Sequence, residues 1–183
     1  MQFNTYTAAG ALVAADLVNE SSASAARLSV LLERYEVHQP TADETAAGEL
    51  RRWAERLRLA FETTGAEQAV VVGALLVAAD CRPRLVSHDG LPHHLHNAPL
   101  DADVTTRVKA LTAAGLAQLI ADGAAGRLGS CAREGCPVVF VDTSRNGRRT
   151  FCSVRCANAV NVQRHRARRR CGEAISPARA QAR

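Results

Sequence analysis

The sequence predicts a mainly α protein, in which an all-helical N-terminal domain carries one small β-hairpin and a small module organised around cysteines follows. Three observations predict this fold class. Apolar residues recur at helical spacing through the first 126 residues, only 4% of the residues are aromatic, and four of the six cysteines lie close together near the C-terminus. A core built mainly from Ala, Leu and Val favours helices over a β-sandwich. A chain of 183 residues can form one ordinary domain with a small appendix.

Four helices are expected before residue 80, at 8–19, 21–37, 41–64 and 66–79, because apolar residues there follow a helical period. The third opens with Thr41-Ala42-Asp43-Glu44, a capping box in which Thr41 is the N-cap and Glu44 reaches back to a free N–H. The apolar run at 69–79 is too short to span a membrane and fits a buried helix.

A hairpin is expected at 84–96, where Asp89-Gly90 provides the turn and Pro92 restricts its strand to an edge. A last helix is expected from Asp101 to Asp122, with Gly123 as its stop. The Gly- and Ala-rich segment 122–130 predicts a domain boundary. The predicted divisions are a helical domain at 1–126, a cysteine module at 127–172 and a flexible tail at 173–183.

Charge is divided unevenly along the chain. Residues 1–126 contain 10 Lys/Arg and 15 Asp/Glu, a net charge of −5, whereas residues 127–183 contain 13 Arg and 3 acids, a net charge of +10. Nine Arg lie between positions 145 and 170 with no acid among them. Such asymmetry is typical of an acidic body with a basic segment that binds nucleic acid or a membrane.

The cysteines at 131, 136, 152 and 156 fall as C-x4-C and C-x3-C, two short-spaced pairs that can surround a tetrahedral Zn²⁺. The alternatives are four unligated buried cysteines or two disulfides, neither of which explains how so small a segment folds. The chain begins without the positive segment of a signal peptide, so we expect a cytoplasmic protein, where disulfides are rare. We therefore predict one structural Zn²⁺ bound by Cys131, Cys136, Cys152 and Cys156.

The zinc module is expected to be a treble-clef-like finger, with a knuckle, a hairpin and a helix in that order. Residues 138–142 are β-prone, Asn146-Gly147 is a turn signal, and the chain returns through Thr150-Phe151. Ser153 is a suitable cap for a helix that holds Cys156 in its first turn. The predicted core of the finger consists of Val138, Phe140, Phe151 and Val160.

The pattern C-x4-C, F-x-D-x-S-R-N-x-R-R, F-C-S-x-x-C-x-N-A and R-H-R-A-R over 131–170 resembles the CGNR-type zinc finger. That finger lies at the C-terminus of bacterial proteins described as stress-induced transcription regulators, after an all-helical ABATE domain. The body agrees more loosely, through "ADLVN" at 15–19 and "PHHLHNAPL" at 92–100. The resemblance implies that the four cysteines bind zinc and that the finger binds DNA. The tetrapeptide that names the family reads Cys156-Ala157-Asn158-Ala159 here, so the contact of the family Arg is lost.

The helix after Cys156 predicts a nucleic-acid surface. Asn158, Asn161 and His165 share one helical face, with Arg168 or Arg169 further along, and Val160 and Ala167 are expected to face the core of the finger. Asn and Arg can read base edges while other Arg residues contact phosphates. The predicted contacts are Arg145, Arg148, Arg149, Asn158, Asn161, Arg164, His165, Arg166, Arg168 and Arg169.

These features favour a zinc-finger DNA-binding transcription regulator, whose body senses a small-molecule effector or forms a homodimer. The alternative is a zinc-organised interaction module that docks an acidic protein partner or RNA. We expect no enzyme, because the sequence has no nucleophile elbow, P-loop or H-E-x-x-H motif, and a four-cysteine zinc site is closed to water.

Two further groups of residues are not assigned to a functional site. His88, His93, His94 and His96 cluster at the predicted hairpin, where surface or ligand-pocket packing is favoured over a metal site. Cys81 is expected to be a buried residue at a helix end, and Cys171 a spare thiol.

Overall fold

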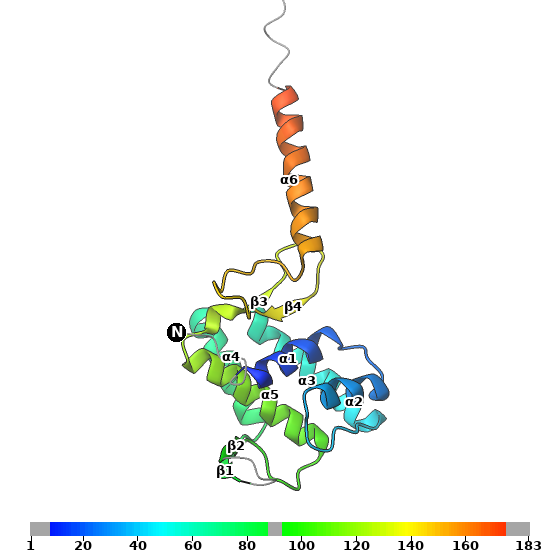
Figure 1. Ribbon diagram of the computed structural model, residues 1–183, viewed down its shortest axis with the longest axis vertical. Coiled ribbons are helices and arrows are strands. Elements are labelled where there is room, and N and C mark those ends of the chain that lie inside the picture. The colour runs from blue at the N-terminus through cyan, green and yellow to red at the C-terminus, as the bar shows by residue number, and fades with distance from the viewer. Residues whose placement is uncertain (1–7, 88–92, 175–183) are drawn as a thin grey trace, which may run out of the picture.

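A computed structural model provides the structure of the protein and describes residues 8–87 and 93–174, with the side chains of the last helix described to Arg169. Across these ranges six helices and two small antiparallel hairpins form, which confirms the mainly α prediction (Figure 1). No helix in the described ranges has the length and apolar character to cross a membrane. In chain order the elements are α1 (Ala9–Asn19), α2 (Ala25–Arg34), α3 (Glu44–Glu62), α4 (Gly65–Ala78), β1 (Arg84–Val86), β2 (His94–His96), α5 (Val104–Ala121), a 3-10 turn (Ala125–Arg127), β3 (Leu128–Ser130), β4 (Val139–Val141) and α6 (Val154–Ala174).

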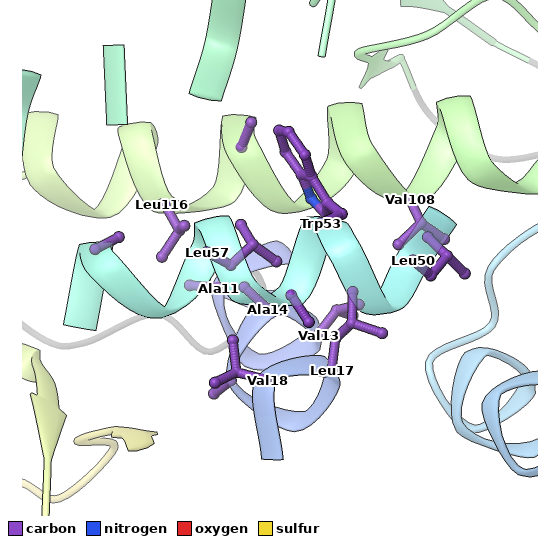
Figure 2. Close-up of a cluster of buried hydrophobic side chains, with 14 of the residues drawn as sticks. Ala11, Val13, Ala14, Leu17, Val18, Leu50, Trp53, Leu57, Val108 and Leu116 are labelled. Atoms are coloured by element: carbon purple, nitrogen blue, oxygen red, sulfur yellow. The ribbon is translucent and has the colours of Figure 1, made fainter. Parts of the chain in front are cut away.

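Helix α1 is the central element of the body, a name used here for residues 8–126. It packs against both α3 and α5, and its apolar residues are buried on most of its sides, as expected of a helix with little polar surface. Figure 2 shows Ala11, Val13, Ala14, Leu17 and Val18 of α1 beside Leu50, Trp53 and Leu57 of α3 and Val108 and Leu116 of α5.

Two glycines allow α1 and α5 to approach each other closely. A Cβ atom added to Gly10 would lie 2.4 Å from the carbonyl oxygen of Leu111, and one added to Gly115 would lie 2.6 Å from the Cα of Gly10. Both distances are below 3.0 Å, which real Cβ atoms essentially never show, so a side chain at either position would force the two backbones apart. The crossing of α1 and α5 is therefore a backbone-to-backbone contact.

The helix ends correct three predictions. Asp43, and not Thr41, is the N-cap of α3, because its Oδ1 accepts from the N–H of Ala46 at 2.8 Å. Helix α2 begins after Ser24 and ends at Arg34, a shorter span than 21–37. Helix α5 begins after Asp103, whose carboxylate accepts from the N–H of Thr106 at 2.7 Å. Gly123 follows α5 with φ +72°, so its predicted role as a stop is confirmed.

The first hairpin is confirmed as an antiparallel pair. Arg84 lies opposite His96, and Val86 lies opposite His94. The predicted turn at Asp89-Gly90, together with His88 and Pro92, lies outside the described residues.

The second hairpin differs from the predicted one. Strand β4 pairs with β3, so that Leu128 lies opposite Val141 and Ser130 opposite Val139, and the cysteine knuckle connects the two strands. Residues 142–153 form turns and irregular chain, although Gly147 has φ +59° as a turn there requires. The physical reason is Asp142, whose carboxylate accepts from the N–H groups of Ser144 and Arg149 and draws the chain away from a second strand.

The β3–β4 sheet packs directly on α1 and α3, and its residues join the core of the body. Leu128, Val139 and Val141 are at most 6% exposed, while Phe140 on the opposite face is 7% exposed. Val138, Phe151 and Val160, the other predicted core residues of the finger, are half-buried. The finger, a name used here for residues 127–174, is thus seated on the body through its sheet.

Candidate metal centre and basic surface

Four thiols converge beside the β3–β4 hairpin. Cys131 follows β3, Cys136 ends the knuckle, Cys152 precedes α6 and Cys156 lies in its first turn. Their Sγ atoms all lie within 4.8 Å of one another, and no other group of three or more ligand-type side chains in the described residues meets in this way. The measured Sγ···Sγ distances are 3.8 Å for Cys136–Cys152, 3.5 Å for Cys152–Cys156 and 3.9 Å for Cys156–Cys136.

Local backbone structure places each thiol. Gly135 has φ +73°, which allows the knuckle to turn just before Cys136. The N–H of Cys131 donates to the carbonyl of Val138 at 2.9 Å and closes the knuckle across the hairpin. Ser153 Oγ accepts from the N–H of Cys156 at 3.3 Å, so its predicted role as the cap of α6 is confirmed.

The thiols differ in how readily they ionise. Burial raises the pKa of Cys131, but N–H donors from Cys152 and Arg133 outweigh burial and bring that pKa to about 7. Burial and the neighbouring thiol of Cys156 raise the pKa of Cys152 to about 12. Four thiolates cannot gather here without a cation, because ligation is what stabilises the ionised form of each thiol.

The arrangement fits one structural Zn²⁺. A tetrahedral site with Zn–S bonds of about 2.3 Å has sulfur–sulfur edges of about 3.8 Å, and the three measured edges lie close to that value. Arg133 also directs its guanidinium at Cys156 Sγ, with a distance of 3.7 Å, and so offsets part of the thiolate charge. Four protein sulfurs leave no coordination position for water, so the site is organised for structure.

The fold and the site define a mainly helical protein with a C-terminal four-cysteine zinc finger. Residues 127–169 match the model of the CGNR zinc finger family, which confirms the resemblance for the finger. No curated protein matches the chain. The resemblance of the body to the ABATE domain stays a prediction.

Asp142 is a site residue that sequence reasoning missed, although it belongs to the F-x-D-x-S-R-N pattern. It is 1% exposed, and its carboxylate accepts from the N–H of Ser144 at 2.8 Å and of Arg149 at 2.7 Å. Arg127 stabilises the same turn, because its Nη1 donates to the carbonyls of Asp142 and Ser144 at 2.7 and 2.8 Å. Asp142 and Arg127 together shape the loop that leads from the hairpin to Cys152.

The residues predicted to contact nucleic acid lie in two exposed places. Arg145 and Arg148 are exposed on the loop that Asp142 organises. Arg149 is engaged with the finger itself, since its guanidinium lies 4.5 Å from the centre of the Phe140 ring and donates to the carbonyls of Phe151 and Cys152. The remaining predicted contacts, Asn158, Asn161, Arg164, His165, Arg166, Arg168 and Arg169, are exposed on α6.

Helix α6 extends away from the body (Figure 1). Val160 is half-buried, but every described side chain from Asn161 to Arg169 is exposed, so the prediction that Ala167 faces the core of the finger is wrong. Among the described side chains of α6, the buried and half-buried ones all lie in its first two turns. Of the two acids in 127–169, Glu134 is exposed and Asp142 is buried, which leaves the accessible surface strongly basic.

Cys81 lies just beyond α4, where it is half-buried and its Sγ lies 3.5 Å from the carbonyl oxygen of Ala110. Burial and then the charge of Asp80 raise the pKa of this thiol, so it is a poor nucleophile. Cys171 lies in α6, beyond the last residue whose side chain is described.

Proposed function

We propose that the protein is a DNA-binding transcription regulator, in which the finger and α6 contact DNA and the body senses an effector or forms a dimer. The observation that carries this proposal is the exposure of α6 on all sides between Asn161 and Arg169, a stretch with four Arg. In the described part of the chain no ion pair neutralises these four Arg residues. A helix that is polar on every side gains no stability from a hydrophobic core, and a polyanion would supply the negative charge that its Arg residues lack.

The dimensions of α6 support insertion into the major groove. An α-helix with its side chains is about 10–12 Å in diameter, which suits the major-groove width of about 12 Å, and the 21 residues of α6 give a length of about 31 Å. Asn158, Asn161 and His165 share one exposed face from which base edges can be read. Arg145 and Arg148 lie on the neighbouring loop and are suited to phosphates. Zinc then acts indirectly, by fixing the start of α6 against the hairpin.

A single small finger binds a specific DNA site weakly, and a second half-site adds affinity. We therefore propose a dimer, with α4 as its contact surface. The exposed face of α4 includes Val70 and Val77, which are 73% and 82% exposed. No charged residue lies between Glu67 and Asp80. The body has a net charge of −5, so two copies repel each other in general. A symmetric contact through this uncharged face brings no like charges together.

An acidic protein partner is the second candidate function, and the half-buried Ala159 favours it. Ala159 stands where the family has an Arg, so the contact with DNA that this Arg implies is missing, while the exposed Arg residues further along α6 can still bind an acidic surface. RNA has less support, because RNA-binding modules present stacking aromatics. Phe140 is buried beneath Arg149, and Phe151 is half-buried.

The test compares two paired variants on duplexes enriched from a random-sequence pool. Arg164→Ala with Arg168→Ala is expected to weaken binding to every duplex and to make the slope of log K against log salt less steep by about 1 per Arg. Asn158→Ala with Asn161→Ala is expected to weaken binding to the enriched duplexes while binding to random DNA persists. If the Asn pair has no effect on the enriched duplexes, base reading by these residues is contradicted. If an acidic peptide binds where DNA does not, the protein-partner function replaces the proposed one.

A further inference from the structure

The two histidines of β2 form a close pair. His94 and His96 are two residues apart on the strand and therefore point to the same face. Their Nε2 atoms lie 3.0 Å from each other, and the ring centres are 4.9 Å apart with the planes tilted by 53°. Two ring nitrogens at this distance share one proton, because one ring must donate while the other accepts.

The pair lies at a hollow on the side of the body away from the finger. The hollow has a volume of about 650 Å³ and is bordered by β2, by the turn after α2 and by α5. Both histidines are half-buried there, and His38 and Glu36 line the same hollow. Glu36 contributes a negative charge, which favours a bound cation.

One positive side chain at this hollow has its guanidinium donors occupied by backbone carbonyls. Arg107 also lines the hollow, and its guanidinium donates to the carbonyl of His38 at 2.7 Å and to those of Leu100 and Ala102 at 3.2 and 2.6 Å. The Tyr35 hydroxyl donates to Asp16 Oδ2 at 2.7 Å, so its polar end is also engaged. Two of the groups that line the hollow, His94 and His96, are imidazoles, which are common ligands of transition-metal ions.

We propose that His94 and His96 chelate a divalent transition-metal ion through their Nε2 atoms. Metal–nitrogen bonds of about 2.0–2.1 Å separate two ligand nitrogens by about 2.9 Å at a right angle and by about 3.3 Å at a tetrahedral angle. The observed 3.0 Å falls between these values, so little movement is needed. When the metal binds, the proton that the two Nε2 atoms shared moves to Nδ1 of the ring that had donated it. Both Nε2 atoms then bind the metal, and no net proton is lost.

This site differs chemically from the cysteine centre. Two imidazoles leave several coordination positions open to water or to donor atoms of an effector, whereas four thiolates leave none. Imidazole suits Ni²⁺, Cu²⁺ and Zn²⁺, and affinity rises from Ni²⁺ to Cu²⁺. The inference does not require DNA binding, but it supplies a metal ion as a signal that the body of a regulator can sense.

The experiment titrates Ni²⁺ into the full-length protein after its cysteine centre has been loaded with one equivalent of Zn²⁺. Heat of binding measures the stoichiometry, and elemental analysis verifies that zinc is retained. We expect one Ni²⁺ per chain, lost in the variant that combines His94→Gln and His96→Gln. His93→Gln is the matched control, because His93 is adjacent in sequence and exposed.

Circular dichroism of each variant verifies that the helical body is intact. The inference is overturned if the wild-type protein binds no Ni²⁺ beyond its zinc, or if the His94/His96 variant binds Ni²⁺ as the wild type does. Loss of binding in the His93→Gln control also overturns it, because the ligands would then differ from those proposed. None of these outcomes depends on DNA, so failure here leaves the proposed function unaffected.

Discussion

The side-chain amide of Asn19 forms two hydrogen bonds with the backbone of Val139, across 120 positions of sequence. Its Nδ2 donates to the Val139 carbonyl at 2.9 Å, and its Oδ1 accepts from the Val139 N–H at 3.0 Å. Asn19 is the last residue of α1, so the central helix of the body pairs with the edge of β4 as a neighbouring strand would. Arg58 of α3 adds a bond to the carbonyl of Pro137 at 2.8 Å.

The first prediction concerns this junction. Asn19→Ala leaves two backbone groups of Val139 without their partner, and we expect a loss of about 1–3 kcal/mol in the free energy of unfolding. Denaturant unfolding followed by circular dichroism measures the loss. Asn161→Ala is the control, since Asn161 is exposed on α6, and equal midpoints for the two variants would contradict the account.

The second prediction concerns the crossing of α1 and α5. Gly115→Ala forces a methyl group into the backbone of Gly10, and we expect destabilisation of about 1–3 kcal/mol or more. Gly48→Ala in α3 is the opposite case, because an added Cβ would meet only the ends of the Arg52 and Arg51 side chains, at 3.7 and 3.9 Å, and the change is expected to stabilise the helix by about 0.5–1 kcal/mol. Thermal unfolding of the two variants should shift in opposite directions.

The third prediction concerns pH and Asp142. Burial raises the pKa of this carboxyl, but hydrogen bonds from Ser144 and the N–H of Arg149 outweigh burial and lower it below its usual value. Its stabilising contribution is therefore present above the ordinary aspartate pKa of about 3.9 and is lost as pH falls through the lower folded-state value. Asp142→Asn should cost about 1–3 kcal/mol at pH 7.

The difference between wild type and Asp142→Asn is expected to shrink as the pH falls below 3.9, which urea unfolding at several pH values can measure. The zinc content is determined at each pH, so that loss of the metal is distinguished from titration of Asp142. The exposed Glu134→Gln serves as the control in the same finger. A difference between wild type and Asp142→Asn that is constant with pH would show that the charge of Asp142 has no role.

The fourth prediction concerns the proposed dimer. Val77→Glu places a charge at an 82% exposed position of α4, so the folded monomer should tolerate it while a symmetric contact brings two like charges together. Sedimentation velocity is expected to show a dimer for the wild type and a monomer for the variant. A wild-type monomer at micromolar concentration would argue against dimerisation through α4.

The features that were predicted correctly from the sequence are those that depend on residues close together along the chain. Helical periodicity and helix caps located the six α-helices of the described residues, and the C-x4-C and C-x3-C spacing identified the four thiols that converge within 4.8 Å. Asp89-Gly90 and the flanking residues predicted the first hairpin, whose strands pair as expected. Each of these signals is contained in a short window of sequence.

Features that depend on distant residues were missed. The β3–β4 pairing was wrongly predicted, because the local turn signal at Asn146-Gly147 is overridden by a buried carboxylate, Asp142, that organises the loop. The contact of Asn19 with Val139 and the approach of Gly10 to Gly115 leave no periodic trace in sequence. Strand β3 lies within the segment 122–130 and packs on α3, and the predicted domain division in this segment stays a prediction.

The zinc centre is coupled to the body, because the hairpin beside its ligands also supplies Leu128, Val139 and Val141 to the core of the body. Removing zinc is therefore expected to loosen the finger, free the start of α6 and lower the stability of the body as well. Acid should have the same effect as a chelator, since the ligands bind zinc as thiolates and protons compete for them.

The most direct measurement is fluorescence anisotropy of labelled duplex DNA titrated with the zinc-loaded protein at several salt concentrations, repeated after chelation. The account predicts binding with a slope of log K against log salt near −5 if about six Arg contact phosphates, and it predicts loss of that binding with the metal. Absence of binding at low salt with zinc in place, or binding that survives chelation unchanged, would contradict it.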